Sequence, residues 1–425
     1  MRQKFLAFLI AILPVAYIYA FPILINNLGH AILLFLIFPL LLLDSSENRN
    51  SKEVKGRKED FSKKTYVLFS VYLATISLLA PMINGFEGDL REMLMAIEFS
   101  VIVYFLISDK KISQPFIEVY TRIAVFFALF LLVQYVGFIF FRTTISGAIP
   151  FLEEYNREVE SISEGRLLRI CSVFAEPSHF AVYVIPALLM YIFGKTRQRL
   201  IVLKILLLTA SVMLSTSSNG ILVMGVVYAS FLLYKFFRKI NVAYFIVGGA
   251  LFLGSFYFIS KSEFINDVTY GLFTEEAGMS MSKAELRVYR GFKLYVDLPI
   301  DKQLFGVGWR NAARYCKTCN NELYSTYSAH TDVFDYFNSI AGTLIYSGII
   351  GLCLLLAFFF SMFKFTNDFS ARTLIICVLV IMSSSSVLMT DQWILFLTTI
   401  ISLINRSRNE ETRCYFVTEC YGNKK

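Results

Sequence analysis

The chain has 425 residues, of which 56% are hydrophobic, 16% are aromatic and only 17% are charged. A soluble protein of this size needs far less apolar sequence, so the composition excludes that class. It predicts an all-α protein with many membrane spans, forming a single integral membrane domain over residues 1–425. The formal net charge is +8, but the basic residues fall mostly in short segments between apolar runs. This placement is a topology signal, and it predicts no nucleic-acid partner.

A membrane-spanning helix needs about 20 apolar residues to cross about 30 Å of hydrocarbon, and shorter runs suffice where other helices surround them. Twelve runs fit this requirement. The first has no convincing signal-peptide cleavage site, so we expect it to remain as an anchor. In chain order the predicted spans are 5–23, 29–43, 65–83, 93–107, 116–140, 180–193, 200–214, 221–237, 242–260, 343–363, 374–388 and 394–404.

The segment 44–64 holds seven lysines and arginines, and the positive-inside rule therefore places it and the N-terminus in the cytoplasm. Counting spans alternately from there puts the other basic segments on the same side, although none of them was used to set the count. The C-terminal tail at 405–425 is among them. The opposite side receives a short loop at 85–92, a medium loop at 142–179 and a large loop at 261–342. Chemistry has room in the two longer loops.

The medium loop ends in Arg166-Leu-Leu-Arg169 and, shortly afterwards, Glu176-Pro177-Ser178. Proline suits the first turn of a helix and glutamate suits its positive end, so the simple interpretation is a capped helix start with basic residues touching lipid headgroups. In the functional alternative, Arg169 binds phosphate at the outer leaflet and Glu176 assists proton transfer.

Three polar features interrupt the apolar runs. The hydroxyl-rich stretch 215–220 is either a tight turn or a broken helix end whose amides meet an anion. The serine run 383–386 lies inside a predicted span, where small residues favour close helix packing. Glu98 also lies within a span, and ionisable residues at that depth are usually paired or functional.

The large loop carries Lys283, Arg287, Arg290 and Lys293, whose spacings of 4, 3 and 3 put all four cations on one side of a helix. They could form only a solvated face. Their apolar and aromatic neighbours instead favour a helix packed on the membrane surface, where arginine forks bind phosphate oxygens bidentately.

The remainder of the large loop adds a turn-like Gly306-Val307-Gly308-Trp309, the pair Cys316 and Cys319, and His330. A lone histidine is usually structural, but its near-neutral pKa would let it take a proton from a sugar hydroxyl. For the cysteines a local disulfide is favoured over a zinc site, since two further ligands are not evident. No nucleotide-binding motif or metal-binding carboxylate cluster stands out, so neither a metal nor a cofactor is expected.

Four ordered stretches carry a resemblance: Arg169-Ile-Cys-Ser-Val-Phe-Ala-Glu176-Pro177-Ser178-His-Phe180; Ser215-Thr-Ser-Ser-Asn-Gly220; Arg287 or Arg290 ahead of Phe305-Gly306-Val307-Gly308; and His330 ahead of Tyr346-Ser-Gly348-Ile-Ile-Gly351. Together they resemble the bacterial O-antigen polymerase and ligase superfamily, nearer the polymerases. Their order and loop placement agree with that family across most of the chain from about residue 65 onward.

The resemblance implies a metal-independent glycosyltransferase of the C fold class in the bacterial inner membrane, with both termini in the cytoplasm. Its substrates would be oligosaccharides linked to undecaprenyl pyrophosphate, and membrane lipid and a chain-length regulator protein its other partners. The implied catalytic residues are His330 and Glu176, which would activate the acceptor hydroxyl, and Arg287 and Arg290, which would stabilise the leaving pyrophosphate. The implied substrate-binding residues are Arg166, Arg169, Lys283, Lys293, Trp309 and Tyr336.

Two alternatives stay open. An O-antigen ligase would have the same cationic site and differ only in its acceptor, the lipid A core. A transporter or flippase of polyprenyl-linked saccharides would be expected to carry cations along its spans and related repeat halves. Here the charge concentrates in the outside loops and no convincing internal repeat is present.

Overall fold

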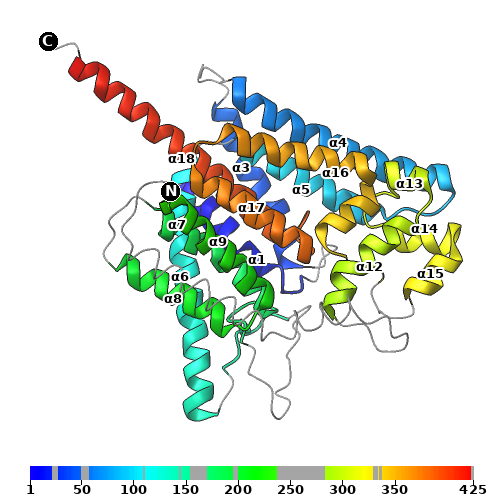
Figure 1. The fold of residues 1–425 in the computed structure, drawn as a ribbon, viewed down its shortest axis with the longest axis horizontal. Helices are drawn as coiled ribbons and strands as arrows, with labels where there is room; N and C mark the ends of the chain where they lie inside the picture. The colour runs from blue at the N-terminus through cyan, green and yellow to red at the C-terminus, as the bar shows by residue number, and fades with distance from the viewer. Residues whose placement is uncertain are drawn as a thin grey trace.

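The computed structural model describes residues 1–21, 27–48, 57–108, 111–142, 145–153, 170–194, 200–236, 283–328, 334 and 337–422, with only the main chain at 45–48, 57–61, 283–289 and 408–422. Within these ranges the regular structure is helical, apart from one isolated bridge between Ala20 and Asn27 (Figure 1). The prediction of an all-α protein is confirmed for the described part of the chain.

The helices follow the apolar runs. Eleven of the twelve predicted spans are occupied by helix, and the remaining one, 242–260, lies outside the described residues. In chain order the helices are α1 Arg2–Ala16, α2 Leu28–Ile32, the π-helical turn η1 Leu33–Ile37, α3 Phe38–Asn48, α4 Arg57–Asn84, α5 Leu90–Ser108, α6 Ser113–Phe141, α7 Pro177–Phe193, α8 Ile201–Leu214, α9 Ser218–Phe236, α12 Lys283–Asp297, α13 Ile300–Phe305, α14 Ala312–Cys319, α15 Asn321–Ser328, α16 Ser339–Phe365, α17 Phe369–Ser384 and α18 Asp391–Gly422.

Four helical segments of the described chain are long and apolar enough to cross a membrane: Ser62–Asn84, Ser113–Phe141, Ser218–Phe236 and Ser339–Phe365. Four shorter apolar helices accompany them, at Leu28–Asp44, Pro177–Phe193, Ile201–Leu214 and Phe369–Ser384. On α6, Phe126, Phe140 and Phe141 are 62%, 74% and 73% exposed, as expected of side chains that face lipid. The protein is therefore a membrane-embedded helical protein, and its twelve-span topology remains a prediction.

Two predicted spans end earlier than expected. Helix α1 stops at Ala16 rather than at residue 23, because the chain turns back and the Leu28 N–H donates to the Tyr19 carbonyl at 2.8 Å. Helix α17 stops at Ser384 rather than at residue 388, and Ser385 is extended, with φ of −141° and ψ of 155°. The serine run 383–386 therefore ends a helix and does not lie within one.

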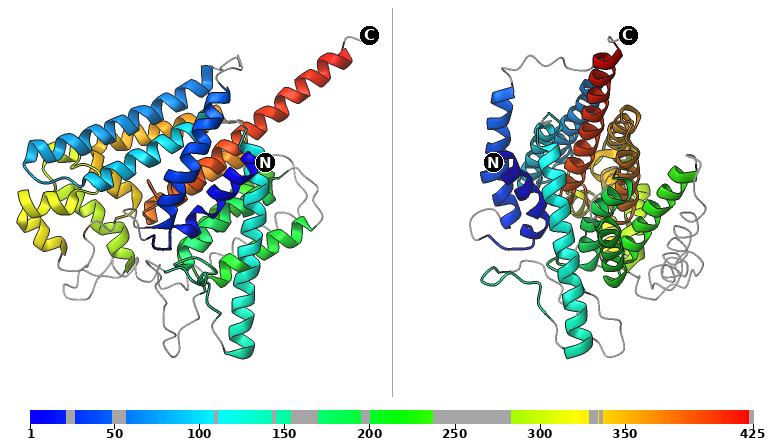
Figure 2. Two further views of the ribbon diagram at one scale, coloured as in Figure 1. Left: turned by 180° about the vertical axis from the view of Figure 1, so that it is seen from behind. Right: turned by 90° about the vertical axis from the view of Figure 1, so that its left-hand side faces the viewer.

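The helices of the predicted large loop, α12 to α15, lie away from the two chain termini (Figure 1). Helix α16 runs along α4, and helices α12, α13, α14 and α15 gather at the end of this pair that lies away from both termini (Figures 1 and 2). The candidate site lies where these loop helices meet the start of α16.

Candidate functional site

Helix α16 is kinked at Gly348, and the glycine turn Gly306-Val307-Gly308 packs against the kink. Gly348 has φ of 65° and ψ of −174°, which breaks the helical hydrogen-bond ladder. The Val307 N–H donates to the Ile345 carbonyl at 3.0 Å, and the Gly308 N–H donates to the Tyr346 carbonyl at 2.9 Å. Gly306 has φ of 86°, and a Cβ there would overlap the Tyr346 main chain. The turn therefore needs glycine both for its dihedral angles and for its close approach.

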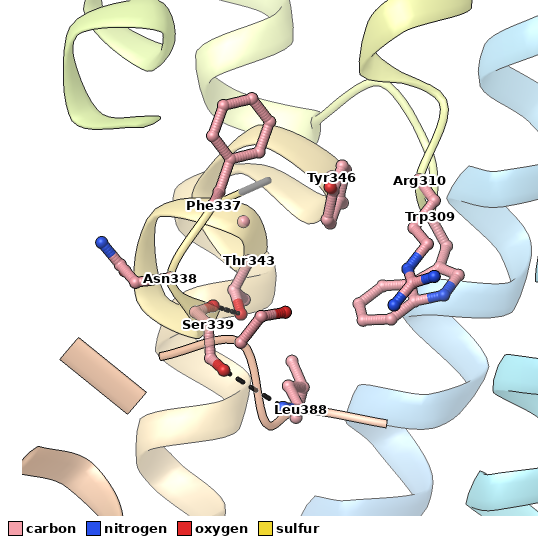
Figure 3. Close-up of a pocket in the computed structure, with 10 residues that line it drawn as sticks. Trp309, Arg310, Phe337, Asn338, Ser339, Thr343, Tyr346 and Leu388 are labelled. Atoms are coloured by element: carbon pink, nitrogen blue, oxygen red, sulfur yellow. Dashed lines mark hydrogen bonds between the residues drawn. The ribbon is translucent and has the colours of Figure 1, made fainter. Parts of the chain in front are cut away.

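A pocket opens beside this turn (Figure 3). Trp309 and Tyr346 form one side, with ring centroids 5.2 Å apart and an interplanar angle of 63°. Arg310, small polar side chains, Phe337 and Leu388 line the remainder. Aromatic surface with a few convergent polar groups is typical of a small-ligand site. The lining residues are Trp309, Arg310, Phe337, Asn338, Ser339, Gly342, Thr343, Tyr346, Ser386 and Leu388.

Ser339 joins the start of α16 to the chain that follows α17. Its N–H and its hydroxyl both donate to the Ser385 carbonyl, at 3.0 and 2.9 Å. The same hydroxyl accepts hydrogen bonds from the N–H groups of Val387 and Leu388, at 2.7 and 3.1 Å. Ser339 thus satisfies three main-chain groups of the non-helical segment after Ser384, and this segment builds one wall of the pocket.

In the stretch 215–220, residues 215–217 form a tight turn between α8 and α9 and residues 218–220 begin α9, and the stretch packs against the serine run. The Asn219 amide donates to the Ser385 hydroxyl at 2.8 Å, and the Ser384 hydroxyl donates to Asn219 Oδ1 at 2.8 Å. The serine run therefore bonds to another motif, whereas the sequence favoured only close helix packing for it. The two stretches are more than 160 positions apart, so neither pattern could reveal the other.

Glu176 and Pro177 begin α7, as predicted, with Glu176 at the N-cap and Pro177 at the first helical position. The Glu176 side chain is partly buried and accepts a hydrogen bond from the Ser178 hydroxyl at 2.9 Å. A Cβ at Gly220 would overlap the Cβ of Ala181, so the first turns of α7 and α9 are in close contact. Glu176 therefore lies on a helix whose neighbour carries Asn219.

Arg290 is buried, with a residue exposure of 2%. Its guanidinium lies 5.4 Å from the ring centroid of Phe334 and 5.7 Å from that of Phe337, and it donates to the Tyr327 carbonyl. Phe337 also lines the pocket, so Arg290 is one side chain removed from it.

Of the four cations in the predicted stripe, only Arg290 and Lys293 have described side chains, and these two differ in exposure. Lys293 is exposed, whereas Arg290, Gly291, Leu294 and Leu298 are buried against the neighbouring helices. A Cβ at Gly291 would lie 2.7 Å from the Cβ of Ala341, which shows how closely α12 approaches α16. Positions i and i+3 lie on the same side of a helix but at different angles, so the packing of α12 against its neighbours buries Arg290 and leaves Lys293 exposed.

The other predicted residues are placed only in part. Trp309 lines the pocket, and Lys283 and Arg287 lie in α12, where only the main chain is described. The residues outside the described part of the chain are Arg166, Arg169, His330 and Tyr336.

Charged residues that the sequence did not single out also converge here. Arg310 Nη1 lies 3.2 Å from Glu92 Oε2. Asp391 lies three residues after the pocket residue Leu388 and ahead of the predicted span 394–404. It is 6% exposed, and this burial raises the pKa of its carboxyl group to about 7. In the sequence, the position of Arg310 directly after the turn Gly306-Val307-Gly308-Trp309 could have indicated that it lies at the site. For Asp391 the sequence held no such signal.

Glu98 is paired, one of the two outcomes predicted for it: its Oε2 lies 3.4 Å from Nδ1 of the buried His30. The disulfide prediction is wrong. Cys316 and Cys319 are both free cysteines of α14. Cys316 is buried, whereas Cys319 is exposed and its Sγ donates to the Asn84 carbonyl at 3.4 Å.

No protein-family model matches this sequence, and no curated protein matches it. The interpretation of the site therefore depends on its own geometry and chemistry. A partly apolar pocket bordered by arginine, hydroxyl and amide groups can hold a polar, anionic ligand at the surface of a membrane protein.

Proposed function

We propose that this protein is a membrane glycosyltransferase of the O-antigen polymerase kind. It transfers a growing glycan from undecaprenyl pyrophosphate to a lipid-linked repeat unit at the periplasmic face of the inner membrane. One observation carries the proposal: described parts of stretches that resemble the family's motifs, far apart in the sequence, bond to segments that border the pocket at the start of α16. The glycine turn bonds to the Tyr346 carbonyl, and Asn219 bonds to Ser384 and Ser385.

In the proposed reaction, a hydroxyl oxygen of the acceptor sugar attacks the anomeric carbon of the donor glycan. The bond from that carbon to the pyrophosphate oxygen breaks, and polyprenyl pyrophosphate leaves with the electron pair. The hydroxyl proton passes to a base, for which His330 and Glu176 are the candidates. The partial burial of Glu176 at the head of α7 supports a carboxylate that stays within reach of a polar substrate.

Charge on the leaving group is the main electrostatic demand of this reaction, and fixed cations lower its barrier without reorganisation. Arg287 or Arg290, together with Arg169, would meet that demand. Arg166, Lys283 and Lys293 would add attraction for the anionic lipid. Trp309 and Tyr336 would contact the sugar rings, and the aromatic wall of the pocket supports this role for Trp309.

The ligase alternative shares this site and differs in the acceptor. Lipopolysaccharide from a strain lacking the gene separates the two. A polymerase mutant retains core carrying a single repeat unit, whereas a ligase mutant retains bare core.

The proposal is tested with the purified full chain in liposomes, supplied with synthetic lipid-linked repeat units. Chains longer than the starting unit, resolved by gel electrophoresis, are the expected result. Absence of longer chains together with movement of the lipid-linked unit across the bilayer would instead establish the transporter alternative.

A further inference from the structure

Arg310 stands in an unusual backbone conformation at the edge of the pocket. It follows Trp309 directly, and both residues line the pocket (Figure 3). Its φ is 49°, in the left-handed region that non-glycine residues rarely adopt. Residues held in this way persist only where the surrounding structure enforces them, and they cluster at functional sites. Here the enforcement is visible, because the Trp309 N–H donates to the Ser77 hydroxyl at 2.9 Å.

The two arginines nearest the pocket are engaged differently. The guanidinium of Arg290 lies among aromatic rings and donates to a main-chain carbonyl, with a residue exposure of only 2%. The side chain of Arg310 is 37% exposed and borders the pocket. A guanidinium holds its five N–H donors in a fixed planar fork.

We propose that Arg310 is the residue of this pocket that binds the phosphate of a polyprenyl pyrophosphate, with Glu92 orienting its guanidinium. The assignment rests on the proposed function for the nature of the lipid. Its chemistry is that of a permanently charged planar fork, which pairs bidentately with phosphate oxygens. Trp309 and Tyr346 would then hold the apolar faces of the sugar beside that phosphate.

The chain contains a matched control. Arg314 Nη2 lies 2.6 Å from Asp89 Oδ2, so Arg310 and Arg314 each pair with an acid of the segment 85–92. Their side chains are 37% and 45% exposed, but Arg314 is not among the pocket residues. Arg310→Ala and Arg314→Ala therefore remove comparable ion pairs, and only the first removes a charge from the pocket.

The chain also contains its own reporter. It has two tryptophans. Trp309 lines the pocket, whereas Trp393 is fully buried against Phe359, with ring centroids 5.7 Å apart. In a Trp393→Phe background, emission from Trp309 reports on the pocket alone. If that variant folds poorly, the difference between the natural chain and Trp309→Phe isolates the same signal.

The experiment titrates the purified full chain in detergent with farnesyl pyrophosphate and follows Trp309 fluorescence. Inorganic pyrophosphate and farnesol are titrated separately, as the anion and the lipid alone. We expect saturable changes with both pyrophosphates. Hydrogen bonds between charged groups strengthen binding more than neutral ones do. Loss of the guanidinium in Arg310→Ala should therefore raise the half-saturating concentration about tenfold to a hundredfold. Arg310→Lys should give a smaller increase, and Arg314→Ala should leave the curve unchanged.

The assignment is overturned if Arg310→Ala titrates like its parent, if Arg314→Ala weakens binding equally, or if farnesol alone reproduces the signal. This measurement requires no chain extension. A protein that binds pyrophosphate through Arg310 but makes no polymer would refute the proposed function and leave the assignment of Arg310 in place.

Discussion

The main-chain N–H of Gly308 donates to the carbonyl of Tyr346 at 2.9 Å. Together with the bond from the Val307 N–H to the Ile345 carbonyl, this bond connects the turn that carries Trp309 to the helix whose first turns carry Ser339 and Thr343. Both sides of the pocket therefore depend on this connection. Both acceptor carbonyls lie just before the break at Gly348. The kink in α16 is therefore part of the construction of the pocket.

Gly348→Ala should destabilise the protein. A Cβ at this position would overlap the main chain at Leu304, and its φ of 65° is strained for any other residue. Strain of this kind costs about 1–3 kcal/mol before any clash is counted. The melting temperature in detergent, followed by size-exclusion chromatography after heating, measures the loss.

The control is Gly225→Ala within α9, where an added Cβ has nothing within 4 Å. That change should be neutral or stabilise by up to about 1 kcal/mol, because alanine is the better helix former. Equal melting temperatures for Gly348→Ala and the natural chain would contradict the structural role given to the kink.

Asn219→Ala should weaken the wall of the pocket. It removes the amide that bonds to both Ser384 and Ser385 and leaves their hydroxyl groups without this partner. The expected cost is about 1–3 kcal/mol of stability, together with reduced chain extension. Ser383→Ala is the control, since that exposed hydroxyl donates to the Val380 carbonyl of its own helix. A loss of equal size in both variants would show that general helix packing, and not the Asn219 contact, is responsible.

Arg290→Ala is expected to abolish chain extension, as is Arg169→Ala. Because Arg290 is buried, its truncation also removes packing against Phe334 and Phe337 and should lower the amount of folded protein. Arg290→Met separates the two effects, since it keeps an unbranched stem and removes the charge. Folded Arg290→Met with normal polymer lengths would limit Arg290 to a structural role, and exposed Lys293→Ala provides the comparison for charge loss on α12.

Asp391 should make stability depend on pH. Burial raises the pKa of its carboxyl group from 3.8 to about 7, so the folded protein retains a proton that the unfolded chain releases. The free energy of unfolding should therefore fall as pH rises from about 4 to about 7 and level off above that. The full contribution is of the order of 4 kcal/mol. Melting temperatures of the natural chain and Asp391→Asn between these pH values test it, and an identical slope in both would exclude Asp391 as the cause.

The sequence by itself determined the class of the protein and the positions of its helices. Long apolar runs leave few options in a membrane, and a Glu-Pro pair or a short run of hydroxyl residues marks a helix end through local backbone chemistry. For this reason α7 begins at Pro177 and a tight turn separates α8 from α9, both as predicted.

Only the tertiary structure decided which side chains meet. Arg290 is buried because α12 packs closely against Ala341 and Phe337. The bond between Asn219 and Ser385 joins residues far apart in the chain. Arg310 borders the pocket because α16 is broken at Gly348, and the carbonyls of Ile345 and Tyr346 just before the break accept hydrogen bonds from the glycine turn 306–308. Each of these results from packing between separate helices, which local sequence patterns do not encode.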